Sequence, residues 1–155
     1  MAYTMTAVMS LAVMNAETPP VACVFASELL LDSLNKIGRN AVQTATYNQR
    51  NVLQDLREDK AIQSDPESMR CIQQIENNQT RFEQNPQMEV QEMQSVADDT
   101  HANYVRLERR ASIIGVPEET VTRIREQKNG WKIALGIVSI VVIVAGVIIC
   151  TTRGK

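Results

Sequence analysis

Apolar and polar positions alternate with a helical period along most of this chain, and the clearest pattern lies between residues 90 and 114. There the apolar positions are separated alternately by three and four residues, which predicts a helix with one apolar stripe. This helix seam consists of Val90, Met93, Ala97, Thr100, Tyr104, Leu107, Ala111 and Ile114. Two interpretations stay open: a coiled-coil-like surface that binds copies or other helices, and an ordinary amphipathic helix of a bundle.

Two earlier stretches carry the same period and predict helices over about 21–62 and 67–84. The first opens with VACVFASELLLDSLNKIG, which is apolar nearly all round and therefore favours burial between helices or against a bilayer. The stripes of the two stretches are Val42, Ala45, Gln49, Val52 and Leu56, then Ile72, Ile75, Gln79 and Phe82. The expected fold class is therefore all-α, with extended helices in a coiled-coil-like hairpin or bundle.

Proline marks two breaks inside this helical region, which spans residues 21–114. Near 64–66, Asp65 is a candidate N-cap and Pro66 a candidate first helical residue. Near 85–86, Asn85 and Pro86 repeat the same combination and predict the start of a third helix there.

Residues 115–130 are expected to form a short helix and a hinge. Gly115 is suited to the left-handed position that ends a helix, and Pro117 to the first turn of the next one. Asn129 and Gly130 then predict a hinge just before the apolar terminus.

Residues 131–152 have the composition of a transmembrane helix. The eighteen residues from 133 to 150 carry no charge and include six Ile, five Val and one Leu. These twelve side chains favour insertion by roughly 4–7 kcal/mol, and eighteen helical residues span about 27 Å of a hydrocarbon layer about 30 Å thick. The alternative, a buried core helix, requires a large apolar partner surface that the rest of the chain lacks.

Aromatic and basic residues bracket this segment and are expected at the membrane interfaces. Trp131 and Lys132 precede the uncharged run 133–150, and the basic tail 153–155 supplies Arg153 and Lys155. Basic residues are more numerous on the amino-terminal side, where Arg123, Arg125 and Lys128 add to Lys132. The bias predicts a single-pass protein with its long amino-terminal part in the cytoplasm, unless a virion or a secreted assembly delivers it to the membrane.

The amino-terminal segment, residues 1–20, is apolar between Met5 and Met14 but has no Lys or Arg before Lys36. A secretory signal normally opens with positive charge, so cleavage is the less favoured interpretation. Otherwise the segment docks on a partner or enters a membrane interface, because it is too short to span.

Composition argues against several classes of function. The net charge is −2 with acidic and basic residues interspersed, so there is no specific signal for nucleic-acid binding. The three cysteines are far apart, the one histidine has no nearby ligand partner, and no nucleotide-binding or hydrolase motif occurs. We therefore expect no catalytic residues, no cofactor and no metal site.

The stretch SELLLDSLNKIGRNAVQTATYNQRNVLQDL loosely resembles the helical openings of type III secretion translocator and filament proteins, over less than a quarter of the chain. The glutamine-rich helices with membrane-active segments are also similar to small ejection proteins of short-tailed phages. These resemblances imply a translocation conduit and supply no site residues.

Two functions are expected from the whole pattern. The first is a non-enzymatic, membrane-anchored structural protein that self-assembles into a homo-oligomer on a lipid bilayer. The second is a tail-anchored, SNARE-like tether or adaptor that binds a partner helix.

Overall fold

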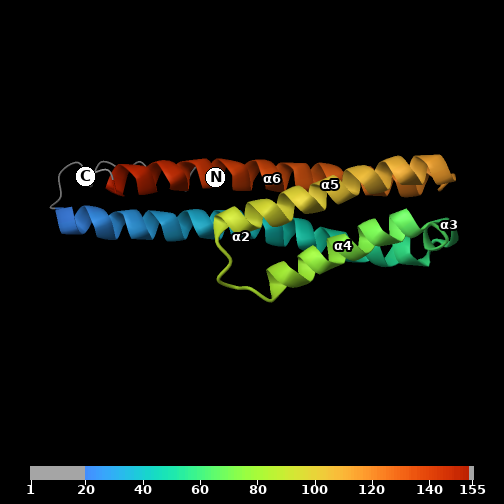
Figure 1. The fold of residues 1–155 in the computed structure, drawn as a ribbon, viewed down its shortest axis with the longest axis horizontal. Helices are drawn as coiled ribbons and strands as arrows, with labels where there is room; N and C mark the ends of the chain where they lie inside the picture. Colours follow the sequence, from blue (N-terminus) through green and yellow to red (C-terminus); the bar gives the residue numbers. More distant parts are fainter. Residues whose placement is uncertain (1–19, 154–155) are drawn as a thin grey trace.

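The computed structural model describes residues 20–153, with side chains from 27 to 152, and within this range the chain forms helices and no strand (Figure 1). The helices are α2 (Pro20–Glu58), α3 (Lys60–Gln63), α4 (Pro66–Glu83), α5 (Val90–Ile114) and α6 (Glu118–Arg153). The all-α prediction is confirmed, and α6 is long and apolar enough to cross a membrane. The amino-terminal segment 1–19 and the last two residues, 154 and 155, lie outside the described residues.

Capping side chains define the turns between the helices. The Asp59 carboxylate accepts a hydrogen bond from the backbone N–H of Ile62 at 3.1 Å and begins α3. Asp65 accepts one from the backbone N–H of Ser68 at 3.1 Å, so the predicted cap of α4 is confirmed. Gly115 ends α5 with φ 80°, the left-handed conformation that the sequence predicted for it.

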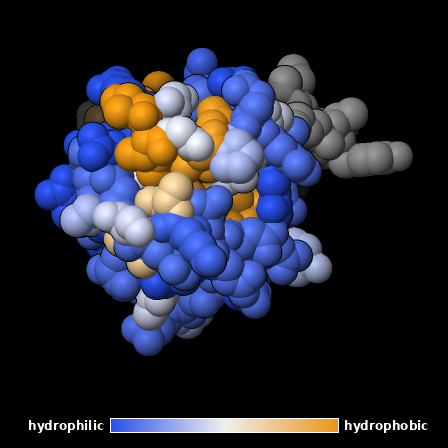
Figure 2. Space-filling model, turned by 90° about the vertical axis from the view of Figure 1, so that its right-hand side faces the viewer, coloured by the Kyte–Doolittle hydropathy of each residue, from blue (hydrophilic) through white to orange (hydrophobic). Residues whose placement is uncertain are grey.

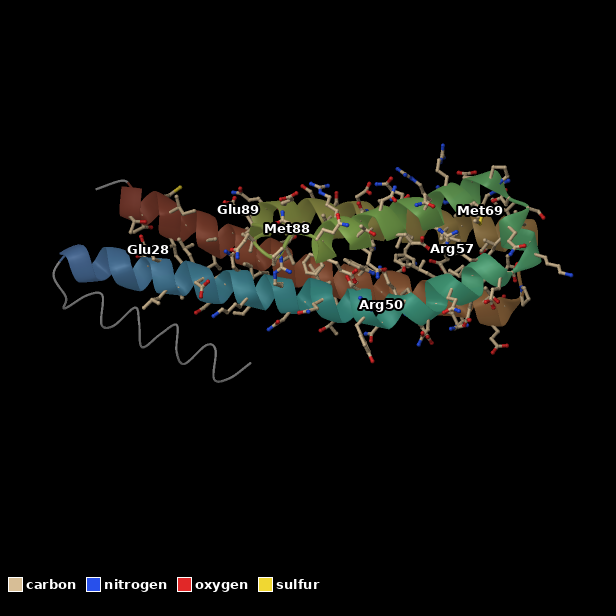
Figure 3. All side chains as sticks on the ribbon, turned by 90° about the horizontal axis from the view of Figure 1, so that it is seen from below. Glu28, Arg50, Arg57, Met69, Met88 and Glu89 are labelled. Atoms are coloured by element: carbon tan, nitrogen blue, oxygen red, sulfur yellow. The ribbon has the colours of Figure 1, made fainter. Side chains whose placement is uncertain are left out.

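The four long helices run alternately up and down (Figure 1). α4 and α5 cover only the carboxyl-terminal part of α2 and the amino-terminal part of α6. Beyond the loop between α4 and α5, α2 and α6 continue side by side, so a four-helix bundle passes into a two-helix projection (Figures 1 and 3).

The predicted seam of α5 faces the interior of this bundle. Its residues from Val90 to Ala111 are buried, and Ile114 at the carboxyl-terminal end is partly buried. The stripe of α2 from Val42 to Leu56 is also fully buried, and so are Ile72, Ile75 and Phe82 of α4. The seam therefore packs against helices of the same chain.

Two predicted helix boundaries are wrong. The first helix ends at Glu58, and the helix predicted to begin at Asn85–Pro86 begins at Val90. The intervening loop instead inserts Met88, 2 % exposed, into the core, which a helix beginning at Pro86 would not do in the same register.

The predicted hinge at Asn129–Gly130 is absent, because α6 is continuous from Glu118 to Arg153. Glycine costs a helix about 1 kcal/mol relative to alanine. Burial of Ile124 and Trp131 on either side, 0 % and 1 % exposed, offsets that cost.

Candidate membrane-binding site

The apolar part of α6 is divided by the end of the bundle. We call Trp131–Ser139 the docked half, because α2 and α5 lie against it. We call Ile140–Arg153 the projecting half, because it continues past α4 and α5 beside α2 alone among the described helices (Figure 1). The boundary is placed by Gly38 of α2, which lies against Val138 of α6 and Val90 of α5.

Two stripes with heptad spacing run along this part of α6, one inward and one outward. The inward stripe is Trp131, Ala134, Val138, Val141 and Ala145, each no more than 7 % exposed. The outward stripe is Ile133, Gly136, Ile140, Ile143, Val147 and Cys150. Its four large side chains are 59–67 % exposed.

The outward stripe leaves α6 more exposed than the core helix of a soluble protein normally is. Only 22 % of its most apolar 18-residue window is buried. A soluble domain rarely leaves so many contiguous β-branched side chains uncovered, and such a surface marks a contact with lipid or protein.

We call residues 20–37, the part of α2 that accompanies the projecting half, the α2 arm. Its described side chains, which begin at residue 27, are amphipathic. Leu30 and Leu34 are buried, 9 % and 7 % exposed, on the side that faces α6. The exposed side carries Glu28, Asp32 and Lys36, and the last two form an ion pair at 3.2 Å.

These charges keep the α2 arm out of a hydrocarbon layer. Each Asp or Lys at the centre of a spanning helix costs about 2.5–3.5 kcal/mol. At that cost Asp32 and Lys36 alone would offset about 5–7 kcal/mol, as much as the roughly 4–7 kcal/mol that α6 gains by insertion, before Glu28 is counted. The arm is compatible with water or with a headgroup region.

The docked half has polar neighbours. The Gln94 side-chain amide of α5 donates a hydrogen bond to Ser139 Oγ at 3.1 Å. A shallow groove beside this bond is lined by Leu135 and by the side chains of Ser95 and Asp98. Polar groups of α5 therefore lie against the middle of the apolar segment.

Trp131 is fixed by a buried polar node that joins four helices. Gln49 Oε1 of α2 accepts hydrogen bonds from Trp131 Nε1 at 2.9 Å and from the Tyr104 hydroxyl at 2.8 Å. Its amide nitrogen donates to Gln79 Oε1 of α4 at 2.9 Å. Burial raises the pKa of Tyr104 far above its usual value, so the hydroxyl stays a donor.

The end of the molecule away from the projection is mostly polar. Figure 2 views that end and shows a mostly hydrophilic surface with a small hydrophobic patch. Arg110 donates to both oxygens of Asp65, at 2.8 and 2.9 Å, and Ser68 Oγ donates at 2.6 Å. Hydrogen bonds from Arg110, followed by those from Ser68, hold the pKa of Asp65 far below its usual value.

One of the predicted membrane-interface residues, Trp131, lies in the interior of the bundle. Trp131, expected at a membrane surface, is 1 % exposed inside the bundle, because its indole N–H is satisfied by Gln49. Lys132 is exposed, Arg153 is the last residue of α6, and Lys155 lies outside the described residues.

The basic residues of α6 also have partners. Arg123 pairs with Asp55 at 2.6 Å, and Lys128 pairs with Glu108 at 2.6 Å. Arg125 contacts Glu108 as well, at 2.9 Å. Carboxylates of α2 and α5 therefore pair with three of the four basic residues that the sequence analysis counted for the orientation.

Sequence reasoning missed Gln49, Gln94 and Ser139 as contacts of the apolar segment. One signal was present: Val121, Ile124 and Trp131 begin an inward face that continues through Ala134 and Val138. From Ile133 onward every face is apolar, so periodicity could not show which face packs on the bundle.

Among residues 20–153 no group of three His, Cys, Asp or Glu side chains is placed to hold a metal ion. Comparison of the chain with protein families, curated proteins and solved structures found no match.

Proposed function

We propose that this chain is a non-enzymatic, membrane-anchored helical protein whose four-helix bundle stays in water while α6 enters a lipid bilayer. The observation that carries the proposal is the outward stripe. Ile133, Ile140 and Ile143 are 66 %, 63 % and 67 % exposed within eighteen residues that carry no charge. Lipid is the partner that accepts an apolar helix face without requiring a shaped complement.

Self-association is the second part of the proposal, and the outward stripe is also its surface. Gly136 lies on the stripe, and a methyl group there would meet nothing within 4 Å. Small residues allow two helices to approach closely in a bilayer, where van der Waals contact drives association. We place the second copy on this stripe, which gives the homo-oligomer that the sequence predicts.

The orientation that we propose is the one favoured by the basic residues, with the bundle in the cytoplasm. Added protease should then digest the bundle in inside-out vesicles and spare it in right-side-out vesicles. The reverse pattern would contradict this orientation without affecting the anchor.

A partner-binding tether is the second candidate. Its binding surface would be the seam of α5, yet Met93, Tyr104 and Leu107 are no more than 1 % exposed within the chain. A foreign helix would have to displace α2, α4 or α6 from that seam, so the anchored self-associating bundle has the better support.

Alkaline carbonate extraction of membranes tests the anchor. Ile143→Arg places a charge on the outward stripe and should release more of the protein into the supernatant, because one Arg costs about 2.5–3.5 kcal/mol of the roughly 4–7 kcal/mol gained by insertion. Ile113→Arg is the matched control, since Ile113 of α5 is 68 % exposed but lies on the bundle. Ile113→Arg should stay with the membrane, and equal retention of both variants would reject the anchor.

The native thiol of Cys150 tests self-association, because it is exposed and lies on the outward stripe. Mild oxidation of vesicles that contain the protein should yield a disulfide-linked dimer, and Cys150→Ser should abolish it. Gly136→Leu should reduce the dimer yield without affecting extraction. If the disulfide forms only by random collision, the dimer yield will fall in proportion as the protein is diluted with lipid. That result would reject self-association on the outward stripe.

A further inference from the structure

We infer that α6 leaves the bundle from Trp131 onward when it spans a bilayer, and that the described arrangement is a closed form in which the α2 arm covers the anchor. This inference rests on the proposed membrane function and concerns how the same segment is controlled. Three independent features of the junction between bundle and projection lead to it.

The first feature is length. The projecting half, Ile140–Arg153, is too short to cross a hydrocarbon layer. Fourteen helical residues span about 21 Å, whereas the layer is about 30 Å thick. The docked half must therefore enter the bilayer as well if α6 is to span it.

The second feature is the surroundings of the docked half. Gln94 and Asp98 of α5 lie beside Ser139 and Leu135, so this half cannot enter hydrocarbon with the bundle still attached. Nor can the α2 arm accompany the projecting half, because its outer side carries Glu28 and the Asp32–Lys36 pair. Both neighbours of α6 have to be left behind at the membrane surface.

The third feature is that the contacts broken by this separation leave few buried polar groups without partners. Gln49 Oε1 loses the Trp131 donor but keeps the Tyr104 hydroxyl, and its amide keeps Gln79. Ser139 can donate to the carbonyl oxygen of Leu135, four residues earlier in the same helix. Released Trp131 would reach the membrane interface, the position for which its type of side chain is suited.

Trp131 is also the reporter for the experiment, because the chain has one tryptophan. Purified full-length protein is reconstituted into phosphatidylcholine vesicles with or without brominated acyl chains, and tryptophan emission is recorded. Release of α6 predicts loss of most of the emission in brominated vesicles, because bromine quenches only fluorophores within the bilayer. Unquenched emission from protein that resists alkaline extraction would overturn the inference and leave the anchor standing.

A disulfide crosslink between α2 and α6 tests the same inference by preventing the release of α6. A Cβ atom at Gly38 would lie 3.9 Å from Val138 Cγ2, so Gly38→Cys with Val138→Cys brings two thiols into contact, and non-reducing electrophoresis shows whether they form a disulfide. The pair is introduced with Cys23→Ser, Cys71→Ala and Cys150→Ser, and this triple variant alone is the control. Circular dichroism checks that both fold.

The oxidised pair should lose alkali resistance and bromine quenching, and reduction should restore both. Equal alkali resistance of the oxidised and reduced forms would overturn the inference. Failure of the wild-type chain and of the reduced pair to resist extraction would instead reject the membrane function, and the inference with it. The quenching measurement on the wild-type chain does not depend on how well the crosslinked variant folds.

Discussion

The bundle and the two-helix projection share two helices, α2 and α6, but the polar and apolar side chains of the two regions are arranged differently. In the bundle, side chains of different helices satisfy one another, as in the node around Gln49 and the Arg110–Asp65 pair. In the projection, α2 keeps its charges on its outer side while α6 leaves Ile140 and Ile143 uncovered. The difference teaches that one helix, α6, passes from a part whose polar groups are satisfied within the chain to a part whose apolar face is uncovered.

The largest effect is expected from placing a charge in each region. Leu107→Asp buries a carboxylate at a position that is 0 % exposed, and should lower the free energy of unfolding by about 4 kcal/mol or more. Ile143→Asp is the matched change on the projection and should leave the thermal unfolding of the bundle nearly unchanged. Circular dichroism melts in detergent measure both, and equal losses would erase the distinction between the two regions.

The next effect concerns the Gln49 node, which joins the start of the docked half to the bundle. Trp131→Phe and Tyr104→Phe each remove one donor to Gln49 Oε1, and each should cost about 1 kcal/mol from the lost hydrogen bond alone. The double variant leaves a buried oxygen without a donor and should cost more than the sum. Urea unfolding of the four proteins gives the coupling energy, and strict additivity would show that the two bonds are independent.

A pH-dependent contribution to stability is expected at the Asp65 cap in the bundle. The folded-state pKa of Asp65 is depressed by Arg110 and Ser68, so its stabilising contribution is present above the unfolded pKa of about 4 and is lost as the pH falls below that value. Asp65→Asn should therefore reduce stability most at neutral pH, and its unfolding curve should approach that of the wild type in acid. Circular dichroism melts of both proteins from neutral to acid pH measure the difference, and a stability loss from Asp65→Asn that is the same at every pH would refute this assignment.

The smallest effects are expected from two glycines. Gly115 has φ 80°, so Gly115→Ala should destabilise the bundle by about 1 kcal/mol. Gly130 lies inside α6 with open space around it, so Gly130→Ala should stabilise by up to about 1 kcal/mol. Urea unfolding distinguishes the signs, and destabilisation by Gly130→Ala would restore the hinge that the sequence predicted.

The sequence predicted those parts of the fold that depend on local pattern. The seam of α5, the cap at Asp65 and the end of α5 at Gly115 follow from spacing and from the preferences of single residues. Asn129–Gly130 misled because tertiary burial of Trp131 outweighs a weak local preference. The loop at Asn85–Pro86 misled because the burial of Met88 depends on the whole bundle.

The candidate site was predictable in composition but not in arrangement. An uncharged run of eighteen residues is visible in the sequence, and so is the apolar opening of α2. That the docked half, Trp131–Ser139, packs against Gln94 and Gln49 depends on contacts between residues 45 and 82 positions apart in the sequence. Such contacts leave no periodic trace where every face of a helix is apolar.

Solvent accessibility in vesicles tests the central claim, that lipid surrounds the outward stripe while water surrounds the bundle. In the variant without native cysteines, Ile143→Cys and Ile113→Cys are reconstituted separately and treated with a water-soluble maleimide. We predict rapid labelling at position 113 and protection at position 143 that detergent removes. Rapid labelling at both positions in intact vesicles, each 67–68 % exposed in the structure, would contradict the account.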